Sequence, residues 1–358
     1  MSYPNGLSCL LPTLQSYDKM LQTNEAAADE ACASCGIAEG SDIKLKKCAC
    51  DLVKYCSDEC KEMHRQEHEA ACKKKMADAI RDKILFTQPE MSHLGECPIC
   101  SLPNPLDEEK SGTFPCCSKR ICKGCSYAHE KSQKQQGRHP KCPFCRESLP
   151  TSIKEIKKRL MKRIKADDSY AMVEMGTISF HKGDYDVAIK YWTKAAELGD
   201  VLAHYELALL YRNGDGVEMN FEKEMYHTEE AAIAGHATAR NNLAMYELRK
   251  GNMDRAVKHF IISAKQGFDS FSYPPLDYVK QGFAKGLVSK EEYAAALRGY
   301  QAAVNATKSD QRAEAYVFLN IEDKGTNGNG VETIQMALSA MMSGKKKFHF
   351  NSFPNNSK

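Results

Sequence analysis

The second half of the chain alternates apolar and polar residues with the period of packed α-helices. Three similar phrases recur there: WTKAAELGD, TEEAAIAGH and IISAKQGFD. Their glycines, Gly199, Gly235 and Gly267, lie 36 and 32 residues apart, and each phrase follows a shorter apolar segment that ends in glycine. A period of this length is typical of stacked helix pairs, so the pattern predicts a mainly α fold that contains an α-solenoid.

These units resemble Sel1-like repeats, relatives of the tetratricopeptide (TPR-like) family. The best copy, YELALLYRNGDGVEMNFEKEMYHTEEAAIAG, carries the Tyr-x-x-Gly-x-Gly-Val turn that marks Sel1. We place the solenoid at residues 167–320 and expect the stretch KEEYAAALRGYQAAVNA to form its capping helix. Residues 321–358 are polar and rich in glycine, which predicts a flexible tail.

A basic linker helix is predicted within residues 147–166, before the repeats. Ser152 can cap it, and four apolar residues share one of its faces: Ile153, Ile156, Leu160 and Ile164. Lysines and arginines cover the other face. A solvated surface is the simplest interpretation and an acidic or nucleic-acid partner the alternative; no aromatic residues lie among the charges, so we do not expect nucleic-acid binding.

The N-terminal 1–31 leader is polar and mostly unassigned. It has no basic region followed by a sustained apolar core, and no stretch of the chain reads as a transmembrane helix. We therefore expect no membrane partner and a cytoplasmic or nuclear location, where thiols stay reduced.

Cysteine usage then divides the chain chemically. Of 16 cysteines among 358 residues, all but Cys9 lie between Cys32 and Cys145. In a reducing compartment, paired cysteines are more often metal ligands than disulfides. A hydrophobic share of 42% is ordinary for a globular protein, and the net charge of +3 favours no class of partner.

The first cluster offers eight donors, enough for two tetrahedral zinc sites. They occur as Cys32-x-x-Cys35, Cys48-x-Cys50, Cys56-x3-Cys60 and His68-x3-Cys72. A spacing of four places both donors on one helical face. The segment KLKKCACDLVKYCSDECKEMHRQEHEAAC resembles a MYND finger. That resemblance implies interleaved sites, one made by Cys32, Cys35, Cys56 and Cys60 and the other by Cys48, Cys50, His68 and Cys72.

Two features of this module, which we place at 32–86, bear on its geometry. His64 competes with His68 as a ligand, and we favour His68 because it shares a helical face with Cys72 and matches the family spacing. The family usually has two residues, not one, between the third and fourth cysteines. Four apolar residues then recur at helical spacing and predict a short closing helix: Met76, Ile80, Ile84 and Leu85.

The second cluster, residues 97–146, resembles a RING finger of the rarer kind with eight cysteines. Its donors occur as Cys97-x-x-Cys100, Cys116-Cys117, Cys122-x-x-Cys125 and Cys142-x-x-Cys145. The resemblance implies one zinc on Cys97, Cys100, Cys122 and Cys125, and a second on Cys116, Cys117, Cys142 and Cys145. Adjacent cysteines on one ion are sterically awkward, so His139 is an alternative to Cys116.

Three residues match positions by which RING fingers contact a ubiquitin-conjugating enzyme and its loaded ubiquitin: Ile99, Pro143 and Arg146. Each also has a structural interpretation. Ile99 can cover a zinc site, Pro143 can stiffen a knuckle, and Arg146 can be a surface charge. The tryptophan that many ligases carry before the last cysteine pair is absent, since Trp192 is the only one in the chain.

The sequence thus predicts two small zinc modules followed by a solenoid, a zinc-binding protein-interaction molecule. We expect an adaptor or scaffold whose MYND finger and concave repeat face hold other proteins and can select substrates for ubiquitination. The alternative is a RING-type E3 ubiquitin ligase that recruits a ubiquitin-conjugating enzyme through residues 97–146. No catalytic residue is assigned, because closed zinc sites leave no open metal position. Sixteen donors predict four zinc ions per chain.

Overall fold

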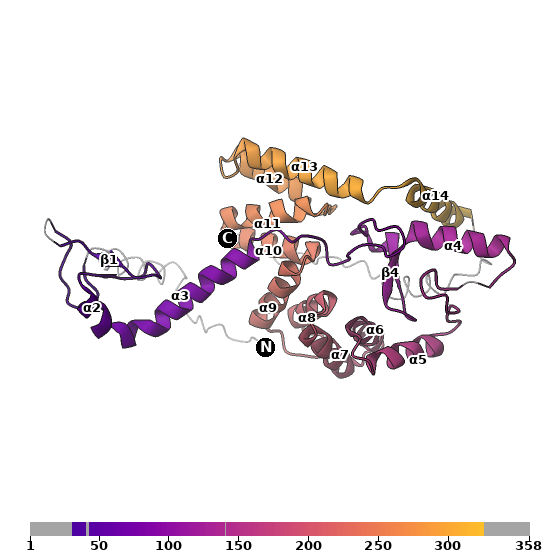
Figure 1. Ribbon diagram of the computed structural model, residues 1–358, viewed down its shortest axis with the longest axis horizontal. Helices are drawn as coiled ribbons and strands as arrows, with labels where there is room; N and C mark the ends of the chain where they lie inside the picture. Colours follow the sequence, from indigo (N-terminus) through magenta and orange to yellow (C-terminus); the bar gives the residue numbers. More distant parts are fainter. Residues whose placement is uncertain (1–30, 41–42, 140, 326–358) are drawn as a thin grey trace, which may run out of the picture. The chain divides into compact units, whose positions relative to one another are not determined.

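The computed structural model describes residues 31–40, 43–139 and 141–325. It is mainly helical, with two short antiparallel sheets, as the sequence predicts. The chain divides into two compact units, Met1–Leu85 and Phe86–Lys358, coloured from indigo to yellow along the sequence in Figure 1. Among the described residues, no helix is both long and apolar enough to span a membrane.

The first unit is a small finger followed by a long helix. Strands β1 (Lys46–Lys47) and β2 (Lys54–Tyr55) pair antiparallel. Helix α2 (Asp58–Met63) begins at Ser57, whose hydroxyl accepts a hydrogen bond from the Cys60 amide, and α3 follows at Arg65–Leu85. Serine is a favoured N-cap because its oxygen satisfies one of the free amides of the first turn.

Helix α3 is longer than the short closing helix expected from the sequence. Its 21 residues contain no glycine or proline, so nothing interrupts the helix after its first turns. In the described part of the chain, Met76, Ile80 and Ile84 are exposed rather than packed, and Leu85 alone of the four is buried.

The second unit begins with the cysteine-rich module at residues 97–146. After a 3-10 turn (Glu108–Lys110), strands β3 (Ser111–Phe114) and β4 (Lys119–Cys122) form a hairpin that leads into α4 (Lys123–Gln135). Phe114 and Ile121 are buried among the cysteines. This module therefore has an apolar centre of its own.

Helix α5 (Ile153–Ile164) connects this module to the repeats. Ser152 caps it as expected, and Ile156 and Leu160 are buried. Arg163 lies at the junction, since its Nε donates to the Ser118 hydroxyl at 2.7 Å and its guanidinium also pairs with Asp168.

Three helix pairs form the body of the repeats. Figure 1 shows them stacked in sequence order. The pairs are α6 (Ser169–Phe180) with α7 (Tyr185–Glu197), α8 (Val201–Asn213) with α9 (Phe221–Ile233), and α10 (Ala237–Arg249) with α11 (Met253–Lys265). The turn glycines Gly199, Gly235 and Gly267 all have positive φ, a conformation that residues with a side chain resist.

Two apolar clusters hold the pairs together. Trp192 is buried at the centre of the first, and its indole N–H donates to the Val173 carbonyl at 3.2 Å. Phe260 is buried at the centre of the second. Close approach of α6 to α7 depends on Gly176, because a Cβ there would lie 2.5 Å from the Trp192 Nε1.

Helices α12 (Pro275–Ala284) and α13 (Lys290–Ala306) follow the third pair. The α13 helix is the segment expected to cap the repeats, and Ser289 and Glu292 form a capping box at its start. A further helix, α14, spans Asp310–Gly325, so residues 321–325 are helical rather than part of the expected tail. Residues 1–30 and 326–358 lie outside the described part of the chain.

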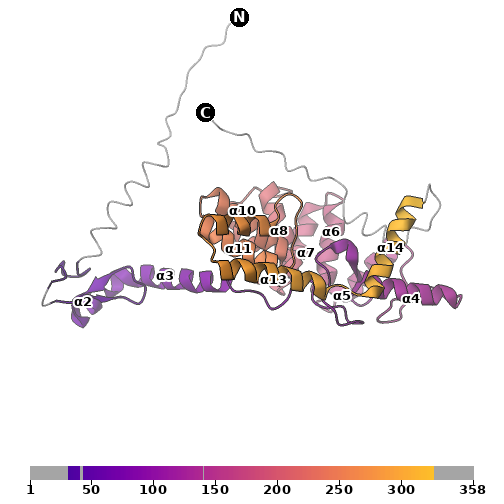
Figure 2. The ribbon, with the colours of Figure 1, turned by 90° about the horizontal axis from the view of Figure 1, so that it is seen from above.

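Helix α14 returns to the cysteine-rich module and lies beside α4, as Figure 2 shows. The Tyr127 and Phe318 rings are 4.8 Å apart, and Lys131 pairs with Glu314 at 2.7 Å. The second module therefore contacts the helical region on two sides, through α5 and through α14.

The Gly176–Trp192 contact predicts a position-specific loss of stability. Gly176→Ala should lower the free energy of unfolding by about 1–3 kcal/mol, because the new methyl group cannot fit against a buried indole. Gly40→Ala is the control, since a methyl group there would meet nothing within 4 Å and Gly40 does not have a positive φ. Urea unfolding of both variants measures the difference; equal midpoints would contradict this account of the α6–α7 contact.

Candidate metal centres

Four groups of donors come together in the structure, and in each group the ligand atoms lie within 4.8 Å of one another. The groups are Cys32, Cys35, Cys56 and Cys60; Cys48, Cys50, His68 and Cys72; Cys97, Cys100, Cys122 and Cys125; and Cys116, Cys117, Cys142 and Cys145. These are the interleaved sets that the two resemblances imply. Each ion site would draw its donors from two separate segments.

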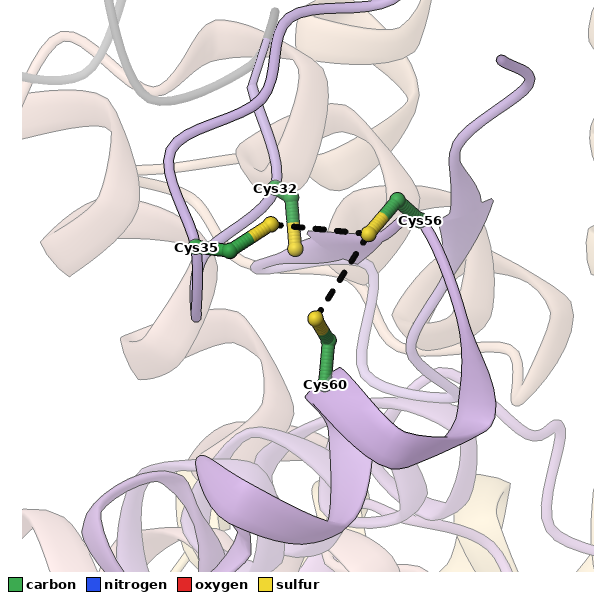
Figure 3. A group of neighbouring side chains, drawn as sticks. All are labelled: Cys32, Cys35, Cys56 and Cys60. Carbon is green, nitrogen blue, oxygen red and sulfur yellow. Dashed lines mark hydrogen bonds between the residues drawn. The ribbon is translucent and has the colours of Figure 1, made fainter.

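The distances between sulfurs suit a tetrahedral ion. Sulfurs at about 2.3 Å from a zinc ion are about 3.8 Å apart along a tetrahedral edge. In the first group, shown in Figure 3, Cys56 lies 3.5 Å from both Cys35 and Cys60. In the fourth, Cys117 and Cys142 lie 3.8 Å apart. Thiolate and imidazole donors in sets of four fit zinc, so these groups could hold zinc ions.

One backbone knuckle recurs at the first cysteine of four pairs. The amide of this cysteine donates to the carbonyl five residues later, at Cys32, Cys48, Cys97 and Cys142. The residue after the second cysteine has positive φ in each case: Gly36, Asp51, Ser101 and Arg146. This turn points both sulfurs of a pair to the same side, which a shared ion requires.

The shorter pair, Cys48 and Cys50, forms the same knuckle with one residue fewer. The Cys48 amide donates to the Val53 carbonyl at 2.9 Å, and the Asp51 amide donates back to the Cys48 carbonyl at 2.9 Å. The missing residue therefore tightens the turn and leaves both sulfurs in the second group.

Helices supply part of the remaining donors of three groups. Cys56 precedes α2, so it does not share a helical face with Cys60 as their spacing predicted. Cys60 lies in the first turn of α2, and His68 and Cys72 lie one turn apart on α3. Cys122 is the N-cap of α4, where its sulfur accepts a hydrogen bond from the Cys125 amide at 3.4 Å. The amides at a helix N-terminus favour a thiolate, but burial has the larger effect here and raises the pKa of the Cys122 thiol.

The two histidines of the first module have different partners. His68 Nε2 lies 3.1 Å from the Cys50 sulfur, within the second donor group. His64 Nδ1 instead lies 3.0 Å from the Tyr55 hydroxyl, and its ring stacks on that of His68. His64 therefore lies outside the donor group and packs against the candidate ligand His68.

The fourth group contains Cys116 and not His139. The Cys145 sulfur lies 3.4 Å from that of Cys116, and Cys116 and Cys117 both reach the group from the turn after β3. His139 is exposed and outside it. Adjacent cysteines can serve together here because the β3–β4 turn presents the pair at its tip.

The donors of a group alter one another's acidity. Hydrogen bonds with Cys35 and Cys60 raise the pKa of the Cys56 thiol to about 12. Burial, and then the nearby His64, lower the pKa of His68, which favours the neutral imidazole. Zinc binds thiolates and neutral imidazole, so an ion would displace the protons that the thiols of a group otherwise share.

Arg312 is a residue at the third group that the sequence analysis did not identify. Its Nη2 donates to the Cys100 sulfur at 3.4 Å, and its Nη1 donates to the Pro103 carbonyl at 2.8 Å. The arginine comes from α14, more than 200 residues along the chain. No local pattern could have indicated it, because its role depends on where α14 packs.

The three residues matched to RING contacts differ in their surroundings. Ile99 is 44% exposed, and Arg146 is exposed with its Nη1 3.4 Å from His129 Nδ1 on α4. Pro143, in contrast, is buried and cannot contact a partner as it stands. Its neighbour Phe144 is 44% exposed.

Comparisons with known families agree with two of the resemblances. Residues 32–72 match the family model described as MYND finger, and residues 169–200, 201–236 and 237–268 each match the Sel1 repeat. The chain therefore contains a MYND finger and three Sel1 repeats, which makes it a zinc-finger protein with domains of the protein-interaction kind.

Two crystal structures of repeat proteins are similar to the chain. A Sel1 repeat protein from Oxalobacter formigenes is 21% identical, with 56% of this chain and 87% of that chain covered and a TM-score of 0.36. The protein c5321, a protective antigen of uropathogenic Escherichia coli strains with an SLR fold, is 19% identical, with 55% of this chain covered and a TM-score of 0.35. This chain spans about half of c5321, 49% of its length. The comparison with curated proteins gave no match.

Metal analysis can count the occupied sites. Four donor groups predict four zinc ions per folded chain. Cys60→Ser should reduce the content by about one ion, because the first group loses a thiolate, whereas Cys9→Ser should leave it unchanged. Mass spectrometry of the purified, folded proteins provides the count. Two ions or fewer in the wild type would show that at least one module does not bind two zinc ions.

Proposed function

We propose that the protein is a zinc-stabilised adaptor whose MYND finger and Sel1 repeats bind different proteins. The observation that carries the proposal is the composition of the four donor groups. Each contains four side chains of this chain, enough to complete a tetrahedron. Such sites build surfaces and leave no coordination position for a substrate, so their role is to hold loops in place for recognition.

The exposed apolar residues of the repeats support this role. Phe271, in the loop between α11 and α12, is fully exposed, and Phe221 and Tyr226 on α9 are also exposed. Large aromatic side chains at a surface often anchor protein partners. We propose that the repeats use such residues to hold one partner while the finger holds another.

An affinity-capture experiment tests the adaptor proposal. Full-length protein should capture two separable sets of partners. Cys60→Ser, which opens the finger, should remove one set, and Phe271→Ala should weaken binding of the other by about tenfold, which is roughly 1.4 kcal/mol. Cys9→Ser is the control. If both variants lose the same partners, or neither loses any, the chain does not bridge two proteins.

A second candidate function is that of a RING-type E3 ubiquitin ligase. It is favoured by the exposure of Ile99 and Phe144 on two knuckles of the second module, and by Arg146, which lies beside α4. In this function the module does no covalent chemistry. It recruits a charged ubiquitin-conjugating enzyme and holds the ubiquitin in a reactive position, an effect that can contribute several kcal/mol to lowering the barrier.

Ubiquitin discharge from a panel of conjugating enzymes tests this second function. Ile99→Ala and Arg146→Ala should each slow discharge at least about tenfold, or roughly 1.4 kcal/mol, with zinc content unchanged. Ile37→Ala is a matched control, because Ile37 is 45% exposed but belongs to the other module. If the intact protein stimulates discharge from no enzyme of the panel, the ligase function is rejected and the adaptor function remains.

A further inference from the structure

The segment between α3 and the second module lies along the repeats. Its first anchor is Phe86, whose ring centroid is 4.6 Å from that of His259 on α11. Two cations of the same helix, Arg255 at 4.8 Å and Lys258 at 5.4 Å, lie over the Phe86 ring. A ring that meets an imidazole and two cations is held by more than apolar contact.

The second anchor is His93, seven residues further on. Its imidazole stacks on that of His236 with centroids 4.1 Å apart, and His236 stacks in turn on Tyr205 of α8 at 4.1 Å. The His93 amide also donates to the Gly235 carbonyl at 3.2 Å. The neighbouring Leu94 is buried. Side-chain stacking and a backbone hydrogen bond thus act together at this end.

Gly235 lets the segment approach the α9–α10 turn. A Cβ at Gly235 would lie 2.6 Å from the Met91 carbonyl oxygen and 3.2 Å from the His93 nitrogen. The equivalent glycine of the first repeat, Gly199, has a similar positive φ and no such neighbour within 4 Å. The absence of a side chain at Gly235 therefore serves the bound segment as well as the turn.

Between the anchors most side chains of the segment are exposed, although the Met91 carbonyl lies close to Gly235. Thr87, Gln88, Glu90 and Met91 are exposed. The segment is thus held chiefly at two points, Phe86 and His93, with a backbone hydrogen bond at the second.

We infer that α8, the α9–α10 turn and α11 form a binding site for extended peptides that carry an aromatic residue and an imidazole seven positions apart, and that residues 86–94 occupy it as an intramolecular ligand. The inference deepens the proposed adaptor function, on which its biological use rests. A tethered ligand has an effective concentration on the order of millimolar, so it masks the site from weaker competitors.

A labelled synthetic peptide of residues 84–96 tests the site, with fluorescence anisotropy as the readout and full-length zinc-loaded protein as the partner. Phe86→Ala combined with His93→Ala in the protein should free the surface. The peptide should then bind at least about tenfold more tightly than it binds the wild type. A peptide with the same two alanines should bind neither protein.

Gly235 provides a matched pair of controls. Adding Gly235→Ala to the double variant should abolish peptide binding, because the new Cβ occupies the position of the peptide backbone. Adding Gly199→Ala introduces the same kind of backbone strain without that clash and should leave peptide binding unchanged. Circular dichroism and zinc content confirm that each variant is folded.

If the alanine variant does not fold, Phe86→Leu with His93→Gln removes the ring contacts and keeps most of the side-chain volume. Equal affinity of the peptide for wild type and a folded double variant, or no binding to that variant, would overturn the inference and leave residues 86–94 as a packed linker. The assay needs no external partner. A negative result in the peptide assay would therefore not contradict the adaptor proposal. A negative result in the capture experiment would not contradict the peptide site.

Discussion

The gathering of four donors around one point is the constraint on which both cysteine-rich modules depend. In the apolar cluster of the first module, among the described residues, four cysteines are buried together with Tyr55. So small a module buries too little apolar surface to fold well by itself. Structural zinc can supply about 10–16 kcal/mol of apparent binding free energy to such a module, so coordination and folding would be a single event there.

The fold of the second module is stabilised by other contacts as well as by its donor groups. Phe114 and Ile121 form an apolar centre, and Arg163 and Arg312 connect its turns to α5 and α14. Arginine suits this role because its planar guanidinium donates several hydrogen bonds in different directions. The exposed Ile99 and Phe144 belong to a module that lies in the same compact unit as the repeats.

The repeats themselves show how small sequence differences change the use of a common unit. Gly199, Gly235 and Gly267 occupy the same turn and share a positive φ. Only the surroundings differ: open space at Gly199, the backbone of Met91 at Gly235, and Ala303 of α13 at Gly267. The same turn is thus a solvent-exposed corner, a contact for an extended segment and a contact for the capping helix.

The sequence by itself determined the features that depend on neighbours close in the chain. Cysteine spacing indicated the local donor pairs, and the recurring glycines predicted the helix pairs, since a knuckle or a helix forms among residues only a few positions apart. How the donor pairs combine into four sets came from the resemblances to MYND and RING fingers, and the structure gathers the same sets. Only the tertiary structure decided that Ile80 is exposed and Pro143 is buried. It also decided that Arg312 donates a hydrogen bond to Cys100 and that the Phe86 ring contacts His259 of α11. These depend on contacts between residues tens to hundreds of positions apart. No local pattern encodes them, because they arise only when whole elements pack against one another.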